Sequence, residues 1–195
     1  MSVLVYAEHQ AGTFKKSAFE AITYGKKTAE QLGAECVALV LGSQASDTGR
    51  LGVYGADRVL HVNGAQLDAF DSQTYTKVIA EVAGQVDAKV IIMNHSANGK
   101  GLLGRLAVRL NAGSVSAASA LPQTDGGFRV RKGVFSGKAF ADYEISSDIK
   151  LLSVISNAIA PEEMGEPKEA EVISVAVEAP KTTVRELSRV EGKTP

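Results

Sequence analysis

The chain begins with a short apolar run at residues 2–5, followed by a Gly-containing loop and a stretch of mixed polarity. That stretch repeats small or apolar residues at spacings of three and four, at Phe14, Ala18, Ile22, Gly25, Ala29 and Leu32. An unbroken apolar run is typical of a parallel strand covered on both faces, and the spacing after it predicts a helix with one buried stripe. Gly33 supplies the stop of this helix.

The same alternation continues to about residue 120. Largely apolar runs at 35–42, 58–62 and 88–93 and a run of small residues at 114–120 predict four further strands. Helical patterns at 47–54, 71–85 and 102–110 lie between them. Strands that alternate with helices favour an α/β fold with right-handed crossovers. We therefore expect a doubly wound, mostly parallel sheet with helices on both faces, a Rossmann-like arrangement of three layers similar to adenine-nucleotide hydrolases.

The pattern changes after Asp125. Residues 128–135, 138–145 and 149–156 are strand-like and separated by short polar or Gly turns, so we expect antiparallel additions at the sheet edge. An acidic loop rich in Pro and Gly follows, and 170–177 predicts one more strand. Residues 180–195 are polar and cannot close a core of their own. The expected organisation is one domain at 1–178 and an arm or linker at 179–195.

Composition excludes several classes of protein. A net charge of -1 with 22% charged residues gives no electrostatic bias towards nucleic acid or membranes. No run approaches the roughly 18 apolar residues of a membrane span. The first strand leaves no room for a signal or transit peptide, and the single cysteine, Cys36, excludes an internal disulfide. We expect a cytoplasmic protein that binds no nucleic acid and is not embedded in a membrane.

Ligands of doubly wound folds bind at the carboxyl ends of the strands, where the strand order reverses. The loop at Gly12 and the loop at 94–101 both follow strands there, and their backbone amides could cradle a phosphate, with Lys100 adding charge. Neither G-x-x-x-x-G-K-[ST] nor G-x-G-x-x-G is present, and glycine in such loops is also ordinary turn chemistry. Phosphate binding and simple turns are the two alternatives.

The sequence gives little evidence for a catalytic site. His9 and His95 follow strands that we expect to be neighbours, but neither a third metal ligand nor a nucleophile accompanies them. Their ordinary role is to hydrogen-bond backbone in loops, and a hydrolase that uses them is the alternative. We expect Cys36 to be a small buried apolar residue and not a reactive thiolate. Arg105 and Arg109 share one helical face, either solvated or available to an acidic partner.

Several motifs, taken in order, resemble the electron-transfer flavoprotein alpha subunit. They are residues 2–5 with Ala7, Glu8, His9 and Gly12, then residues 34–42, 55–59, 96–101, 104–110, 137–139 and 184–187. The resemblance covers essentially the whole chain. It implies a heterodimer with a beta subunit that relays electrons from dehydrogenases, such as the acyl-CoA dehydrogenases of fatty acid oxidation, to a quinone reductase or another acceptor.

In that family, flavin adenine dinucleotide (FAD) is held chiefly by a second, carboxy-terminal alpha domain, and this sequence ends before such a segment. The resemblance thus implies a scaffold that docks on the beta subunit, an electron-carrier component rather than an enzyme, with no FAD and no catalytic residue of its own. A nucleotide in the crevice would meet Ala7, Glu8, Gly42, Ser96, Asn98, Gly99 and Lys100. The alternative is a free-standing adenine-nucleotide-binding module of the universal-stress type, and a weak homodimer of the isolated chain is also open.

Overall fold

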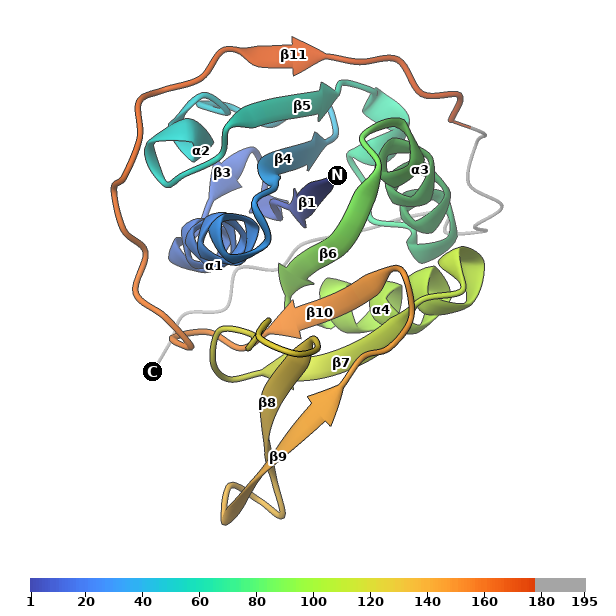
Figure 1. The fold of residues 1–195 in the computed structure, drawn as a ribbon. Helices are drawn as coiled ribbons and strands as arrows, with labels where there is room; N and C mark the ends of the chain where they lie inside the picture. The colour runs from blue at the N-terminus through green and yellow to red at the C-terminus, as the bar shows by residue number, and fades with distance from the viewer. Residues whose placement is uncertain (178–195) are drawn as a thin grey trace, which may run out of the picture.

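The computed structural model of this chain describes residues 1–177, in which strands and helices alternate much as the sequence predicts. In chain order the elements are β1 (Ser2–Tyr6), β2 (His9–Gln10), β3 (Thr13–Phe14), α1 (Lys16–Leu32), β4 (Glu35–Leu41), α2 (Arg50–Val53), β5 (Arg58–Val62), a 3-10 turn (Ala65–Leu67), α3 (Ser72–Gln85), β6 (Ala88–Asn94), α4 (Ala97–Leu110), β7 (Gly113–Ala118), β8 (Arg129–Val134), β9 (Ala139–Glu144), β10 (Lys150–Val154) and β11 (Ala170–Val172). Figure 1 shows them along the chain.

Within the described residues, the main sheet has the order β11-β5-β4-β1-β6-β10-β7-β8-β9. Successive strands step outward from β1 through β4 to β5 on one side, whereas β6 pairs with β1 on the other side. All neighbouring pairs from β11 to β7 are parallel, whereas the pairs β7–β8 and β8–β9 of this sheet are antiparallel. The expected doubly wound, mostly parallel fold is confirmed, and its strand order reverses between β1 and β6.

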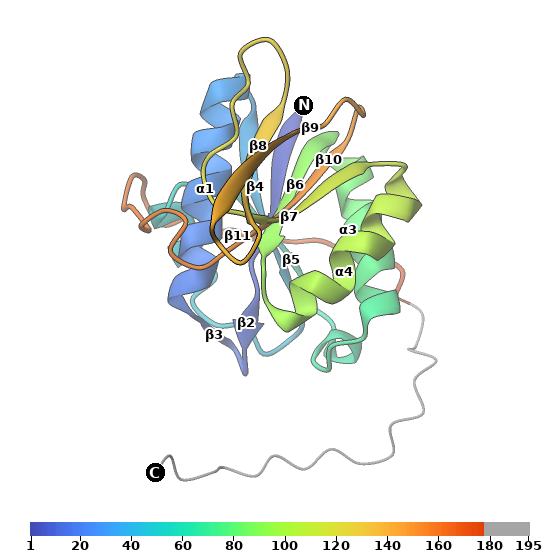
Figure 2. The ribbon, with the colours of Figure 1, turned by 90° about the horizontal axis from the view of Figure 1, so that it is seen from below.

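Helices cover both faces of the sheet, which gives three layers (Figure 2). Val3 and Val5 of β1 face the core under α1, while Leu4 and Tyr6 face the core under α3 and α4. This alternation follows from the two-residue period of a strand. Because both faces are buried, β1 is fully buried along its length, as its unbroken apolar sequence predicts.

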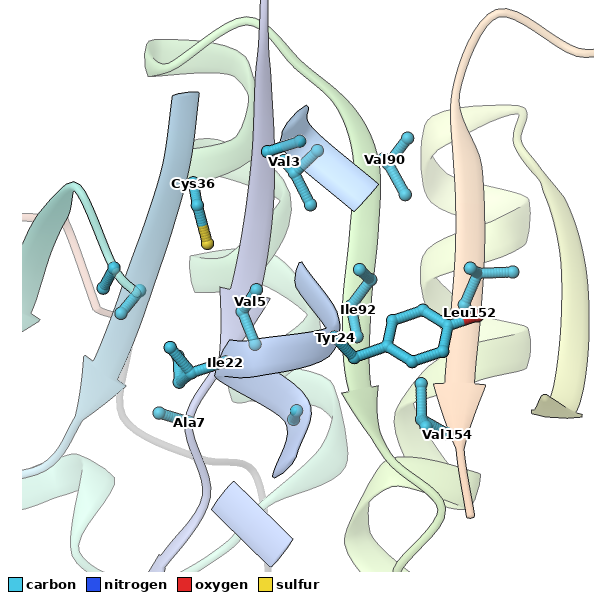
Figure 3. Packing of buried hydrophobic residues seen from close by; sticks show 14 of the residues in the cluster. Val3, Val5, Ala7, Ile22, Tyr24, Cys36, Val90, Ile92, Leu152 and Val154 are labelled. Carbon is cyan, nitrogen blue, oxygen red and sulfur yellow. The ribbon is translucent and has the colours of Figure 1, made fainter. Parts of the chain in front are cut away.

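The core under α1 is closely packed (Figure 3). Gly25 lets α1 approach the sheet, since a Cβ added there would lie 2.3 Å from Val5 Cγ2 and 3.4 Å from Cys36 Sγ. Tyr24 is fully buried, its ring lies towards Leu152 and Val154, and its hydroxyl donates a hydrogen bond to the Ala120 carbonyl at 2.7 Å. Burial raises the pKa of this phenol.

One strand assignment from the sequence is wrong. Residues 149–156 were expected to add an antiparallel strand at the sheet edge, but β10 lies inside the sheet and is parallel to both β6 and β7. The chain leaves β7, forms the antiparallel pair β8–β9, and then returns between β7 and β6 (Figure 1). Leu151 and Leu152 are fully buried, one on each face of the sheet, which explains why β10 occupies a central position.

Other elements are confirmed with different lengths. The predicted helix at 47–54 contains only α2, and the strand predicted at 170–177 pairs with β5 over Ala170–Val172 alone. The Gly12 loop is a small hairpin of β2 and β3, which the sequence pattern did not reveal. The predicted arm or linker at 179–195 lies outside the described residues. No helix among residues 1–177 is long and apolar enough to cross a membrane.

Candidate functional site

A crevice of ≈ 340 Å³ opens beyond the carboxyl ends of β1 and β6, where the strand order reverses. This is the place where doubly wound folds bind ligands. The residues that line it are Glu8, His9, Gln10, Lys15, Ser17, Asn94, Ser96, Ala97 and Asn98. Both α1 and α4 begin beside the crevice, so its walls are largely polar.

The carboxylate of Glu8 lies at the start of α4. The Ser96 hydroxyl donates to Glu8 Oε2 at 2.5 Å, and Asn98 Nδ2 donates to Glu8 Oε1 at 2.7 Å. Ser96 also caps α4, because its Oγ accepts the Gly99 amide at 3.0 Å. A helix N-terminus attracts anions, and here the protein's own carboxylate takes that position.

The floor of the crevice joins β6 to α1. Asn94 is only 7% exposed, and its Nδ2 donates to Ser17 Oγ at 3.3 Å. Gly99 packs directly against this floor, since a Cβ added there would lie 1.9 Å from the Asn94 carbonyl oxygen. Gly99 is therefore required for the close packing of α4 on β6.

The structure brings together part of the predicted nucleotide crevice. Glu8, Ser96 and Asn98 line it, whereas Ala7 is fully buried in the core and Gly99 supports it from below. Gly42 and Lys100 are not among its lining residues. Whether a nucleotide binds stays a prediction.

Sequence reasoning missed Gln10, Lys15 and Ser17, which also line the crevice. Gln10 is placed there by the short hairpin of β2 and β3, for which the sequence carries no clear signal. Lys15 and Ser17 were accessible to prediction, because the helices that follow β1 and β6 both begin at the switch point.

The two loop histidines differ in their surroundings. His9 Nε2 lies 2.8 Å from the Leu41 carbonyl oxygen, and its Nδ1 accepts a hydrogen bond from the Gly12 amide at 3.2 Å. Both ring nitrogens are therefore engaged by backbone groups. His95 does not line the crevice, and its Nδ1 lies 2.8 Å from Ser153 Oγ. Burial lowers the pKa of His95, as do Lys100 and Lys132. The pair therefore does not share one crevice, contrary to the arrangement that a hydrolase would need.

The described residues form neither a metal-binding cluster nor a reactive thiol site. No three His, Cys, Asp or Glu side chains of residues 1–177 gather closely enough to hold a metal ion. Cys36 is fully buried, and this burial raises the pKa of its thiol. A buried thiol with a raised pKa is a poor nucleophile, so Cys36 serves packing, as the sequence predicts.

The crevice does not fit FAD. A dinucleotide brings two phosphates, and the helix N-terminus at α4 that would receive one already holds the Glu8 carboxylate. At ≈ 340 Å³ the crevice is also at the small end of ligand pockets, which span about 300–1,000 Å³.

A second prominent feature is the β8–β9 arm, residues 129–144, which projects from the body of the molecule (Figure 1). Three of its aromatic side chains are exposed: Phe135 by 77%, Phe140 by 67% and Tyr143 by 45%. The arm is stiffened by Arg131, whose Nε and Nη2 donate to the two oxygens of Asp142 at 2.8 and 2.9 Å.

The tip of the arm holds an aromatic residue in an unfavourable backbone conformation. The Gly137 amide donates to the Val134 carbonyl at 3.1 Å, and the two residues between them, Phe135 and Ser136, have φ of 51° and 53°. Turns of this kind favour Asn and Gly, because a bulky side chain is strained at positive φ. Backbone strain of this kind is concentrated at functional sites, so Phe135 is a candidate functional residue.

These features define a class: a doubly wound α/β domain that carries a polar crevice at its switch point and an exposed antiparallel arm at one edge. The model of the family described as "Electron transfer flavoprotein domain" matches residues 3–180. The chain belongs to the electron transfer flavoprotein domain family, in agreement with the resemblance carried by the sequence motifs.

Curated relatives agree with this membership. The electron transfer flavoprotein subunit alpha of Bacillus subtilis is 30% identical over 154 residues, which cover 78% of this chain and 46% of that protein. The protein FixB of Clostridium saccharobutylicum is 33% identical over 57% of this chain and 33% of its own length. The acryloyl-CoA reductase electron transfer subunit beta of Anaerotignum propionicum is 30% identical over 57% and 30%. The matched part of this chain spans less than half of each of these relatives.

Proposed function

We propose that this chain is the scaffold and partner-docking domain of an electron-transfer flavoprotein alpha subunit. With a beta subunit it forms part of a carrier that relays electrons from dehydrogenases, such as acyl-CoA dehydrogenases, to an acceptor. Membership of the family and the names of the relatives support the electron-transfer role. In this proposal residues 1–178 form the domain, residues 179–195 lead towards a flavin domain, and FAD is bound outside this chain.

The β8–β9 arm is the observation that carries the docking role. A two-stranded hairpin is marginally stable alone, and apolar side chains grouped on a monomer surface mark interaction sites. Here Phe135 at the tip and Phe140 on β9 are exposed on such a hairpin, and Tyr143 is exposed on the opposite face of β9. Aromatic residues are also enriched among the side chains that contribute most to protein interfaces. We therefore assign the arm to the contact with the beta subunit.

Docking is tested with the purified chain and the beta-type subunit of the same organism, by isothermal titration calorimetry and by mass in solution. We expect a 1:1 complex with the wild-type chain. Phe140→Ser should weaken it by about tenfold or more, since truncating an aromatic anchor of an interface costs about 2 kcal/mol or more. Val172→Ser is the matched control: Val172 is 66% exposed, as Phe140 is 67% exposed, but it lies on β11 at the opposite edge of the sheet.

A second variant separates docking from folding. Phe135→Asn removes the ring and places a residue that tolerates positive φ at the tip of the arm. We expect unchanged or increased stability together with weaker binding of the beta subunit. Full-strength binding by both Phe135→Asn and Phe140→Ser would refute the assignment of the arm. The absence of any complex with the wild-type chain would refute the docking function itself.

A further inference from the structure

A second hollow lies on the face of the molecule opposite α1. The α3–α4 groove has a volume of ≈ 560 Å³ and is formed by Gln73, Thr76 and Lys77 of α3 with Gly104, Arg105, Val108 and Arg109 of α4. The two helices lie side by side on one face of the sheet (Figure 2). The groove shares no lining residue with the switch-point crevice.

The groove is lined by an apolar side chain, Val108, that nothing in the described residues covers. Val108 is 85% exposed, the highest exposure among the large hydrophobic side chains of residues 1–177. One turn before it stands Gly104, and a Cβ added there would meet no atom within 4 Å. A bulky side chain of another molecule could therefore enter beside Val108 without displacing this helix.

Arg105 and Arg109 differ from the other arginines of the described chain. Arg58 pairs with Glu171, Arg131 pairs with Asp142, Arg129 donates to the Asp125 carbonyl, and Arg50 lies over the Phe19 ring. Arg105 and Arg109 have no ion pair or hydrogen bond within residues 1–177. They stand one turn apart on α4, on either side of Val108 in sequence.

We propose that the α3–α4 groove binds an acidic amphipathic helix of a partner protein. Two carboxylates four residues apart on such a helix match the spacing of Arg105 and Arg109, and an apolar residue between them reaches Val108. A helix laid along two parallel ridges fits the way helices pack, and recognition of an amphipathic helix in a groove is a common binding mode. Charge complementarity selects an acidic occupant over a basic one.

The probe is a fluorescein-labelled peptide of 18 residues, with Leu repeated at helical spacing and Glu at the flanking positions, titrated with the full chain by fluorescence anisotropy. The same peptide with Lys in place of Glu is the reference. We expect the Glu peptide to bind and the Lys peptide to bind at least about tenfold more weakly, since complementary charge discriminates between partners. Affinity for the Glu peptide should fall as the salt concentration rises, because partly exposed ion pairs are screened.

The variant Arg105→Gln/Arg109→Gln should bind the Glu peptide about fivefold to tenfold more weakly, the effect of losing two exposed ion pairs. Lys27→Gln/Arg58→Gln changes the net charge equally, at surface residues that line neither the groove nor the crevice, and should bind as the wild type does. Val108→Ser should also weaken binding, by a factor that is the same at low and high salt, because it removes an apolar contact and leaves both arginines in place. Equal binding of both peptides, equal losses in the two charge variants, or no binding of the Glu peptide would overturn the proposal. A dimeric mass in solution that becomes monomeric in Val108→Ser would also overturn it, because a second copy of this chain would then occupy the groove.

Discussion

Replacing Glu8 with Gln is the sharpest test of how the switch-point crevice is built. The carboxylate accepts hydrogen bonds from Ser96 at 2.5 Å and from Asn98 at 2.7 Å, at the N-terminus of α4. Gln keeps one acceptor oxygen, loses the charge, and presents an amide where the second oxygen stood. A hydrogen bond to a charged group contributes about 1.5–3 kcal/mol, and because Glu8 is only partly buried the expected loss is about 1–2 kcal/mol.

Urea denaturation of the wild type and of Glu8→Gln measures this loss. For a domain of this size, a loss of about 1–2 kcal/mol corresponds to a melting temperature lower by about 2–8 °C. Glu81→Gln is the matched control, because it makes the same chemical change at an exposed position on α3. We expect Glu81→Gln to remain within about 0.5 kcal/mol of the wild type.

A second measurement addresses the anion position itself. Without the Glu8 carboxylate, the positive end of α4 is open to an external anion. Inorganic phosphate should therefore raise the stability of Glu8→Gln more than that of the wild type or of Glu81→Gln. If Glu8→Gln were as stable as the wild type, or if phosphate stabilised all three proteins equally, the assignment of Glu8 as the resident anion of α4 would be wrong.

Two further predictions concern packing and pH. Gly25→Ala places a Cβ 2.3 Å from Val5 Cγ2 and should lower the free energy of unfolding by about 1–3 kcal/mol, whereas Gly84→Ala in α3, with nothing within 4 Å, should be neutral or stabilising in the same denaturation assay. Burial lowers the pKa of His95, so the unfolded chain takes up this proton first and stability should fall as pH drops below about 6.5. In His95→Gln this part of the pH dependence should disappear from denaturation curves recorded between about pH 8 and pH 5; an unchanged profile would show that other groups cause it.

The layered fold could be predicted because the period of the sequence changes clearly between strand and helix. The position of β10 was predicted wrongly, although the sequence holds a signal for it. Residues 149–155 are almost continuously apolar, like β6, whereas β8 and β9 place charged residues at alternate positions, as Arg129, Arg131 and Asp142 show. A continuous run indicates a strand buried on both faces, so the three strand-like segments did not belong together.

The candidate site could be predicted only in part, for a different reason. The doubly wound order places Glu8 and Ser96 at one crevice, and the sequence was sufficient for that step. The hydrogen bonds from Ser96 and Asn98 to Glu8 depend on how α4 is set against β6, through the contact of Gly99 with Asn94. No pattern in the sequence predicts such a contact between two elements. The exposure of Phe135 and Phe140 was equally hidden, because an alternating strand can have its apolar face covered or open.

The crevice and the arm differ in how far their side chains are already engaged within the chain. In the crevice, Glu8 and Ser96 bind groups of the same chain, which leaves fewer of them available to a ligand. On the arm, Phe135 and Phe140 remain exposed although exposed aromatic surface is unfavourable in water. A domain that binds a nucleotide would be expected to leave the helix N-terminus at the switch point free for a phosphate. This contrast favours recognition of a protein partner over binding of a nucleotide, and it does so independently of the family to which the chain belongs.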